Sequence, residues 1–120
     1  MAYDTGNIFA KILRGEIPCN KVYEDEFALA FHDINPQAPV HTLVIPKGEF
    51  INMVDFSANA SKELVSGFFR AVGETARVLD IEEDGYRLIA NAGGYAPQEV
   101  PHLHFHILSG KPLGPMLSTF

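Results

Sequence analysis

Apolar and polar residues alternate along much of this chain, a pattern typical of half-buried strands. The alternation predicts strands at residues 22–24, 27–33, 41–46, 86–91 and 102–108. Glycine, proline and acidic residues punctuate the chain between several of these segments. Short strands with hairpin-length connections indicate an antiparallel sheet.

Two other segments repeat apolar residues at helical spacing. The first follows Asn7, which can cap a helix, and Gly15 can end it. The second runs over residues 61–79 and has an unusually wide apolar stripe. Such a stripe is typical of a deeply buried helix, or of a helix that packs on the sheet with one side and on a second copy with the other. The small size of the chain favours a homodimer.

These elements predict an α+β fold, a five-stranded antiparallel sheet with one short N-terminal helix and one long helix, in a single domain of residues 1–120. The apolar content of 47% suffices for a core. Cys19 is the only cysteine and excludes an internal disulfide. Because the sequence shows no signal peptide and no apolar run of membrane length, we expect a cytoplasmic protein without a membrane partner.

The charge of the chain limits its ligands. The net charge is −6, and the nine lysines and arginines are scattered. Binding of a nucleic-acid polymer needs a basic stripe, so we expect no such partner. Polyphosphates would be repelled, whereas backbone N–H groups and imidazoles could hold a ligand with one negative charge at its reacting phosphorus.

Three histidines alternate near the end of the chain, at His102, His104 and His106. On an extended strand they would share one face. The residues between them would then face the core: Leu103, Phe105 and Ile107. Imidazole titrates near neutrality and serves as nucleophile, acid, base or metal ligand. Three exposed histidines would be unusual filler in a strand, so the row predicts a functional site.

A metal site and a covalent catalyst are the two chemical interpretations of this row. Successive residues on one strand face lie roughly 6.6–6.8 Å apart, so the outer two histidines are roughly 13 Å apart and cannot share one metal on a straight strand. A metal would need two neighbouring histidines together with His41 or Asp33. In the covalent interpretation the central imidazole attacks, and its neighbours orient it and manage protons. Asn91, Gln98 and the backbone around Gly93 could hold a phosphate.

The segment from His102 to Leu108 resembles the motif of the histidine-triad (HIT) family, in which three histidines alternate with apolar residues. Residues 7–18 resemble the opening helix of that family, residues 30–41 its ribose-binding strand and loop, and residues 43–47 the strand that follows. The opening segment and the compact length indicate the Hint-like branch, purine nucleoside phosphoramidases that act as homodimers.

The resemblance implies a role for each histidine of the site. His104 would be the nucleophile, which forms a nucleotidyl-histidine intermediate. His106 would contact the phosphate and help to protonate the leaving group. His102 would orient the nucleophile and pair with His41.

The resemblance also implies nucleotide contacts. Asp33 would bind the ribose hydroxyls, and Asn91 and Gln98 would flank the phosphate. The nucleoside pocket would be lined by Ile8, Phe9, Ile12, Phe31, Ile34, Leu43 and Val100. Strand parity independently places Phe31 and Asp33 on one face and leaves His32 outside the site.

Two positions depart from the family pattern. Glu99 stands where some Hint proteins carry a serine that touches the phosphate, and we expect its carboxylate to point outward, so that the phosphate has one partner fewer. Ala28 stands where a zinc-ligand cysteine has been proposed for the family. We therefore expect no metal and no cofactor.

The expected function is hydrolysis of the P–N bond of purine nucleoside 5′-monophosphoramidates. Two alternatives use the same nucleotide site. One is a dinucleoside polyphosphate hydrolase, and the other is a nucleotide-binding regulatory or interaction protein. A zinc-binding module is a further alternative.

Overall fold

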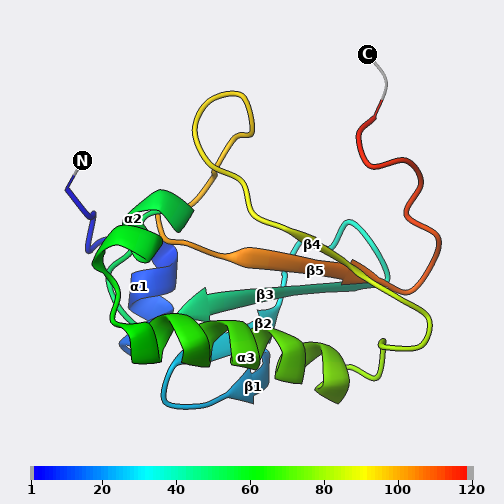
Figure 1. Cartoon of the computed structure of the whole chain (residues 1–120), viewed down its shortest axis with the longest axis horizontal. Coiled ribbons are helices and arrows are strands. Elements are labelled where there is room, and N and C mark those ends of the chain that lie inside the picture. Colours follow the sequence, from blue (N-terminus) through cyan, green and yellow to red (C-terminus); the bar gives the residue numbers. More distant parts are fainter. Residues whose placement is uncertain (1, 119–120) are drawn as a thin grey trace.

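The computed structural model describes residues 2–118 of the chain. Its elements are α1 (Ile8–Leu13), β1 (Lys21–Glu24), β2 (Ala28–His32), β3 (Val40–Pro46), α2 (Met53–Asn59), α3 (Lys62–Val78), β4 (Arg87–Ile89) and β5 (Phe105–Ser109). The five strands form one sheet in the order β1-β2-β3-β5-β4, and each neighbouring pair is antiparallel (Figure 1). The predicted fold class is confirmed.

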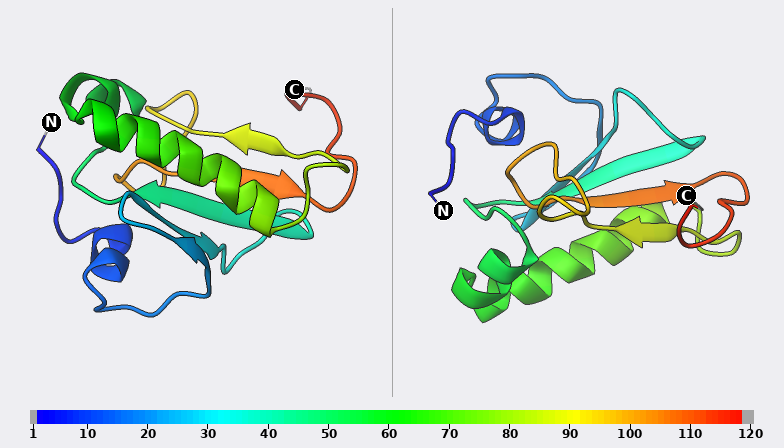
Figure 2. Two further views of the ribbon diagram at one scale, coloured as in Figure 1. Left: turned by 60° about the horizontal axis from the view of Figure 1, so that its bottom comes forward. Right: turned by 90° about the horizontal axis from the view of Figure 1, so that it is seen from above.

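Helices cover both faces of this sheet. Figure 2 shows α1 on one face and α2 and α3 on the other. The alternation along β2 divides its side chains between these faces, since Ala28 and Ala30 pack in the cluster under α3, whereas Leu29 and Phe31 pack in the cluster with Phe9 of α1. The strands therefore separate a larger core from a smaller one.

Local capping bounds the helices where the sequence indicates. The Asn7 side chain accepts a hydrogen bond from the backbone N–H of Ala10 (2.9 Å), and the Ser61 hydroxyl accepts one from Leu64 (3.1 Å). The structure adds α2, a short helix that we did not predict from the sequence. Its cap is Asn52, whose side chain accepts from the N–H of Asp55.

Strand β5 is shorter than predicted. It begins at Phe105, so His102 and His104 both lie ahead of it, in a segment with a bend at Pro101 and His102. Two backbone hydrogen bonds hold this segment, from the N–H of His102 to the carbonyl of Val100 (2.8 Å) and from the N–H of Leu103 to the carbonyl of Phe50 (2.8 Å). The expectation that all three histidines lie on one regular strand is therefore wrong.

The predicted apolar face of this segment is confirmed. Leu103 and Ile107 are buried in the core under α3, and Phe105 packs against it. In the register of the sheet, His106 lies opposite Leu43 of β3 on the face toward α1. Among the described residues no helix is both long and apolar enough to cross a membrane.

Candidate active site

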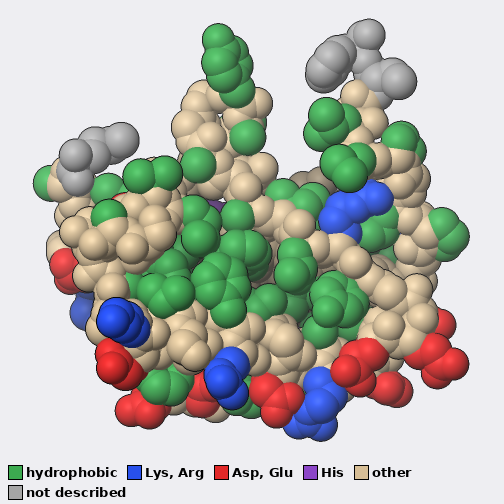
Figure 3. Space-filling view, in the orientation of Figure 1, with side chains coloured by type: hydrophobic (Ala, Val, Ile, Leu, Met, Phe, Trp, Pro, Cys, Tyr) green, Lys and Arg blue, Asp and Glu red, His purple; other side chains and the backbone are tan. Residues whose placement is uncertain are grey.

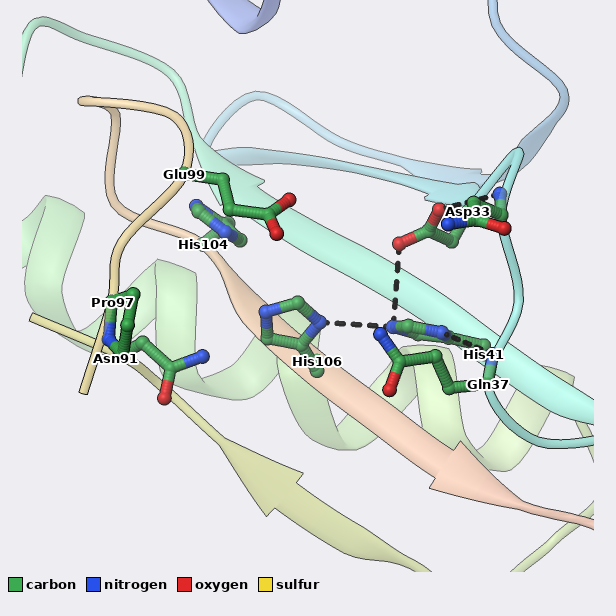
Figure 4. A pocket seen from close by; sticks show the side chains of 9 residues that line it. Asp33, Gln37, His41, Asn91, Pro97, Glu99, His104 and His106 are labelled. Carbon is green, nitrogen blue, oxygen red and sulfur yellow. Dashed lines mark hydrogen bonds and ion pairs between the residues drawn. The ribbon is translucent and has the colours of Figure 1, made fainter.

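Two adjoining cavities lie on the side of the sheet that faces α1. The smaller measures about 140 Å³ and is polar; it is lined by Asp33, Asn35, Gln37, His41, Asn91, Pro97, Glu99, His104 and His106 (Figure 4). The larger measures about 340 Å³ and is mostly apolar; it is lined by Ile8, Phe9, Ile12, Ile17, Pro18, Cys19, Asn20, Phe31, His32, Asp33, Ile34, Asn35, Leu43, Glu99, Val100, His104 and His106. His104 and His106 line both cavities and mark their junction.

The structure brings most of the predicted site residues together. Five of them line the polar cavity: Asp33, His41, Asn91, His104 and His106. The seven residues predicted to form the nucleoside pocket all line the apolar cavity: Ile8, Phe9, Ile12, Phe31, Ile34, Leu43 and Val100. His102 and Gln98 line neither cavity.

His104 presents one ring nitrogen to the cavities. Its Nδ1 lies 2.7 Å from the carbonyl oxygen of His102. A carbonyl can only accept, so Nδ1 carries the proton and the lone pair of neutral His104 is on Nε2. His104 is 7% exposed, and its ring meets that of Phe9 edge to face with ring centroids 5.0 Å apart. Burial lowers the pKa of His104, which keeps that lone pair available at neutral pH.

A hydrogen-bond network fixes the protons of His41 and His106. The backbone N–H of Gln37 donates to His41 Nδ1 (3.0 Å), so the proton of His41 is on Nε2. That N–H lies 2.9 Å from His106 Nδ1 and 3.3 Å from the Asp33 carboxylate. His106 Nδ1 therefore accepts, and neutral His106 carries its proton on Nε2.

Burial lowers the pKa of His106 to about 4, with the neighbouring His104 and His41 adding to the shift. The site thus holds two neutral imidazoles of opposite character, with ring centroids 5.0 Å apart. His104 offers a lone pair and His106 offers an N–H. One can attack an electrophile while the other donates to it.

The expected pairing of His102 with His41 is wrong, because His41 pairs with His106. His102 is fully buried, and its Nε2 lies 3.0 Å from the carbonyl of Pro46 while its Nδ1 lies 2.6 Å from the hydroxyl of Tyr3. Its backbone carbonyl is the group that contacts His104.

The structure also corrects the positions expected for Gln98 and Glu99. The Gln98 amide donates to the carbonyls of Ile51 and Val100, so it braces the loop and does not flank the phosphate cavity. Glu99 does not point away from the site. It lines both cavities, and Figure 4 shows its carboxylate beside His104.

Other lining residues were missed from the sequence. His32 was left out on strand parity, yet the apolar cavity extends around the end of β2 to include it. Four neighbours beyond α1 also line this cavity: Ile17, Pro18, Cys19 and Asn20. The polar cavity adds Asn35, Gln37 and Pro97. Asn35 and Gln37 lie between the predicted residues Asp33 and His41, and that spacing is the signal that could have found them.

Asp33, His41 and His106 offer three ligand atoms within 4.8 Å of one another, which is close enough to hold a metal ion. The hydrogen bond from Gln37 occupies the lone pair of His41 at Nδ1, and Nε2 carries a proton. His41 then has no lone pair for a metal. The donor set fits a proton-sharing network better than a metal centre.

Comparison with known proteins gives the family. The profile of the HIT domain matches residues 14–113. The chain belongs to the HIT family. It is 61% identical to an uncharacterized 13.2 kDa HIT-like protein of Azospirillum brasilense, over 97% of this chain and 95% of that protein. It is 46% identical to the purine nucleoside phosphoramidase of Escherichia coli K12, over 98% of this chain and 97% of that enzyme.

Solved HIT structures share the fold. A histidine triad protein from Clostridium difficile is 40% identical and superimposes with a TM-score of 0.85 over 97% of this chain and 100% of its own. A HIT family hydrolase from Legionella pneumophila is 39% identical, with a TM-score of 0.81 over 89% of this chain and 95% of its own. The family resemblance drawn from the histidine motif is thereby confirmed.

Proposed function

We propose that this HIT protein hydrolyses the P–N bond of purine nucleoside 5′-monophosphoramidates through a nucleotidyl-His104 intermediate. The observation that carries the proposal is the pair of neutral imidazoles at the junction of the two cavities, one with a free lone pair and one with an N–H. The 46% identity to a purine nucleoside phosphoramidase supports the same reaction class.

The two cavities fit the two parts of such a substrate. The apolar cavity can hold the base, with the rings of Phe9 and Phe31 in its wall. Asp33 lines both cavities, and its carboxylate can accept hydrogen bonds from the vicinal ribose hydroxyls. The polar cavity can hold the phosphoryl group, where Asn91 supplies an amide.

The first chemical step forms a P–N bond to His104 and breaks the P–N bond to the leaving amine. The lone pair on His104 Nε2 attacks the α-phosphorus, and the bonding pair leaves with the nitrogen of the amine. The Nε2–H of neutral His106 donates a hydrogen bond to the phosphoryl group as charge develops there. The leaving nitrogen takes up one proton from solvent and departs as the amine.

In the second step, water attacks the intermediate and His104 is the leaving group. Water attacks the phosphorus of the nucleotidyl-His104 intermediate and releases one proton to solvent, which balances the proton taken up by the leaving nitrogen in the first step. The products are the nucleoside monophosphate and regenerated His104. Net, one water is consumed, one P–N bond is broken and one P–O bond is formed.

Charge favours a phosphoramidate over a polyphosphate. Among residues 2–118, no lysine or arginine lines either cavity, whereas the carboxylates of Asp33 and Glu99 line both. A monoanionic phosphoramidate meets less repulsion there than a dinucleoside polyphosphate does. A purely regulatory nucleotide-binding role does not require the opposed protonation of His104 and His106.

Trapping the intermediate tests the proposal directly. The protein is mixed with an adenosine 5′-phosphoramidate, quenched with acid-free denaturant, digested and examined by mass spectrometry. We expect one nucleotidyl adduct, on His104, and none in His104→Gly. A rapid turnover without any adduct on His104 would overturn the mechanism, and the absence of turnover would overturn the function.

We also propose that the protein is a homodimer joined along β4. That strand is at the edge of the sheet, and an edge strand presents unpaired backbone groups. Hydrophobic side chains gather on the face over α3 and β4 (Figure 3), and Phe69, Val78 and Leu88 are more than 40% exposed. Leu88→Glu should give a monomer by sedimentation; a wild-type monomer would contradict the proposal.

A further inference from the structure

Tyr3, in the segment ahead of α1, contacts the histidine motif at a point that does not line either cavity. The hydroxyl of Tyr3 lies 2.6 Å from Nδ1 of His102, a residue 99 positions later in the chain. The two rings meet edge to face, with centroids 5.7 Å apart and planes at 72°. Tyr3 lines neither cavity, so it is placed to act on the site only through another residue.

The contacts of His102 fix the direction of this hydrogen bond. The carbonyl of Pro46, 3.0 Å from Nε2, can only accept, so His102 carries its proton on Nε2. Nδ1 then has a lone pair, and the Tyr3 hydroxyl donates to it. Burial raises the pKa of Tyr3, which keeps the hydroxyl protonated. Because the side chain of His102 is fully buried, loss of this donor would leave Nδ1 without a partner in a dry environment.

His102 connects Tyr3 to His104 by its own backbone. The carbonyl of His102 accepts from Nδ1 of His104 at 2.7 Å. His102 therefore accepts a hydrogen bond from Tyr3 at its ring and accepts another from His104 at its backbone carbonyl. Phe9 supports both rings, with its centroid 6.3 Å from His102 and 5.0 Å from His104. Movement of the His102 ring would shift the bend whose carbonyl aims His104.

We propose that Tyr3 is a positioning residue for the reaction: its hydroxyl holds His102 in one tautomer and orientation, and the carbonyl of His102 then holds His104 with Nε2 toward the substrate. This inference rests on the function proposed above. It adds a residue outside the histidine motif and outside both cavities to the groups that set the rate of attack.

Tyr3→Phe tests the inference, because it removes the hydroxyl and keeps the ring. Tyr23→Phe is the matched control, since its hydroxyl donates to the Asp25 carboxylate (2.9 Å) on the β1–β2 hairpin, away from the site. We expect Tyr3→Phe to slow formation of the His104 adduct in a single turnover about tenfold, the effect of about one hydrogen bond. Binding of adenosine monophosphate should change by less than about twofold, because no cavity residue is altered. Tyr23→Phe should match the wild type in both measurements.

A spectroscopic readout separates positioning from a general loss of structure. Nitrogen-15 spectra of labelled histidine report which ring nitrogen carries the proton. We expect His102 protonated on Nε2 and His104 on Nδ1 in the wild type, with the His102 signals displaced in Tyr3→Phe and unchanged in Tyr23→Phe. Because the first observation uses the wild type alone, it holds even if Tyr3→Phe does not fold.

Each result has a defined meaning. An adduct rate in Tyr3→Phe equal to that of the wild type would overturn the inference and leave the proposed function intact. A proton on Nδ1 of His102 in the wild type would also overturn it. Absence of both turnover and adduct in the wild type would overturn the proposed function, while the spectra would still test the link from Tyr3 to His102.

Discussion

The two faces of the sheet use neighbouring residues for different purposes. In β5, Phe105 and Ile107 pack under α3, whereas His106 between them faces α1 and the cavities. The α3 face buries apolar side chains under a helix of 17 residues. The α1 face is covered by a helix of six residues and keeps two cavities open beside buried imidazoles. One strand thus contributes to the core with one face and to chemistry with the other.

This contrast has an energetic basis. Burial of apolar groups on the α3 face stabilises the fold, in proportion to the area removed from water. Burial of the histidines on the α1 face disfavours their charged forms and requires a hydrogen-bond partner for each ring nitrogen that does not open onto a cavity. The donors and acceptors that meet this requirement also set the tautomers that the chemistry uses.

The sharpest test of the contrast uses two residues three positions apart. His104→Gly should lower kcat by roughly 10⁴-fold or more, the size expected when a nucleophile is lost. Ile107→Ala should lower the free energy of unfolding by about 2–5 kcal/mol, because it opens a cavity in the core. Phosphoramidate kinetics and urea titration of both variants measure the two effects.

Each variant is the control for the other. Ile107→Ala that remains folded should keep an adduct rate near that of the wild type, and His104→Gly should lose less stability than Ile107→Ala. If Ile107→Ala instead lost activity per folded molecule as steeply as His104→Gly, the two faces would be coupled and the contrast would fail.

The pH dependence of stability offers a second test, because buried histidines lie on the α1 face. Burial lowers the pKa of both His102 and His106 to about 4, from 6.5 for an ordinary histidine. Between these values the unfolded chain binds protons that the folded chain does not, so the free energy of unfolding falls as pH drops from 6.5 to about 4. The slope reaches at most about 1.4 kcal/mol per pH unit for each histidine.

Urea titrations across this pH range check the sign of the slope and whether the histidines cause it. Stability should be nearly flat with respect to these groups above pH 7, and His106→Gln should make the acid slope shallower. Glu24, whose pKa two lysine contacts lower to about 2, contributes only in a lower window, between 4.5 and 2. A slope unchanged in His106→Gln would contradict the assignment of the slope to this histidine.

The pH dependence of the kinetics tests the nucleophile in the same way. The lowered pKa of His104 should place the acid limb of kcat/KM below pH 6.5.

The sequence predicted the division between the faces but not the partners within the site. The alternation Ala28, Leu29, Ala30, Phe31 predicts which side chains point to each face, because the strand period is fixed. The partner of His41 depends instead on which strands are neighbours and in what register. With Leu43 opposite His106, His41 becomes a diagonal neighbour of His106.

Loops account for the other errors. The alternation of side chains between two faces holds only within a regular strand. The segment before Phe105 is not a strand; its path depends on backbone hydrogen bonds to Val100 and to the distant Phe50, which no sequence pattern reveals. The direction of Glu99 and the backbone contact of Gln98 depend on that path. Tyr3 was not found because no periodicity links a residue before the first helix to one that is 99 positions away.

Substitution of Glu99 has the smallest expected effect. It tests whether charge on the α1 face makes the site prefer a phosphoramidate over a dinucleoside polyphosphate. Its carboxylate lines both cavities, and within residues 2–118 it has no hydrogen-bond or ion-pair partner, so its charge acts on whatever binds. A further phosphate charge about 6 Å away would cost about 1.4 kcal/mol at an effective dielectric constant of about 40, or roughly tenfold in binding. Glu99→Ser should therefore raise the ratio of kcat/KM for a diadenosine polyphosphate over an adenosine phosphoramidate by about tenfold or less, and added salt should shrink the difference. Glu63→Ser, which removes an exposed carboxylate on α3, should leave the ratio unchanged. If Glu99→Ser left the ratio unchanged as well, the preference for a monoanion would have to come from the shape of the cavities and not from their charge.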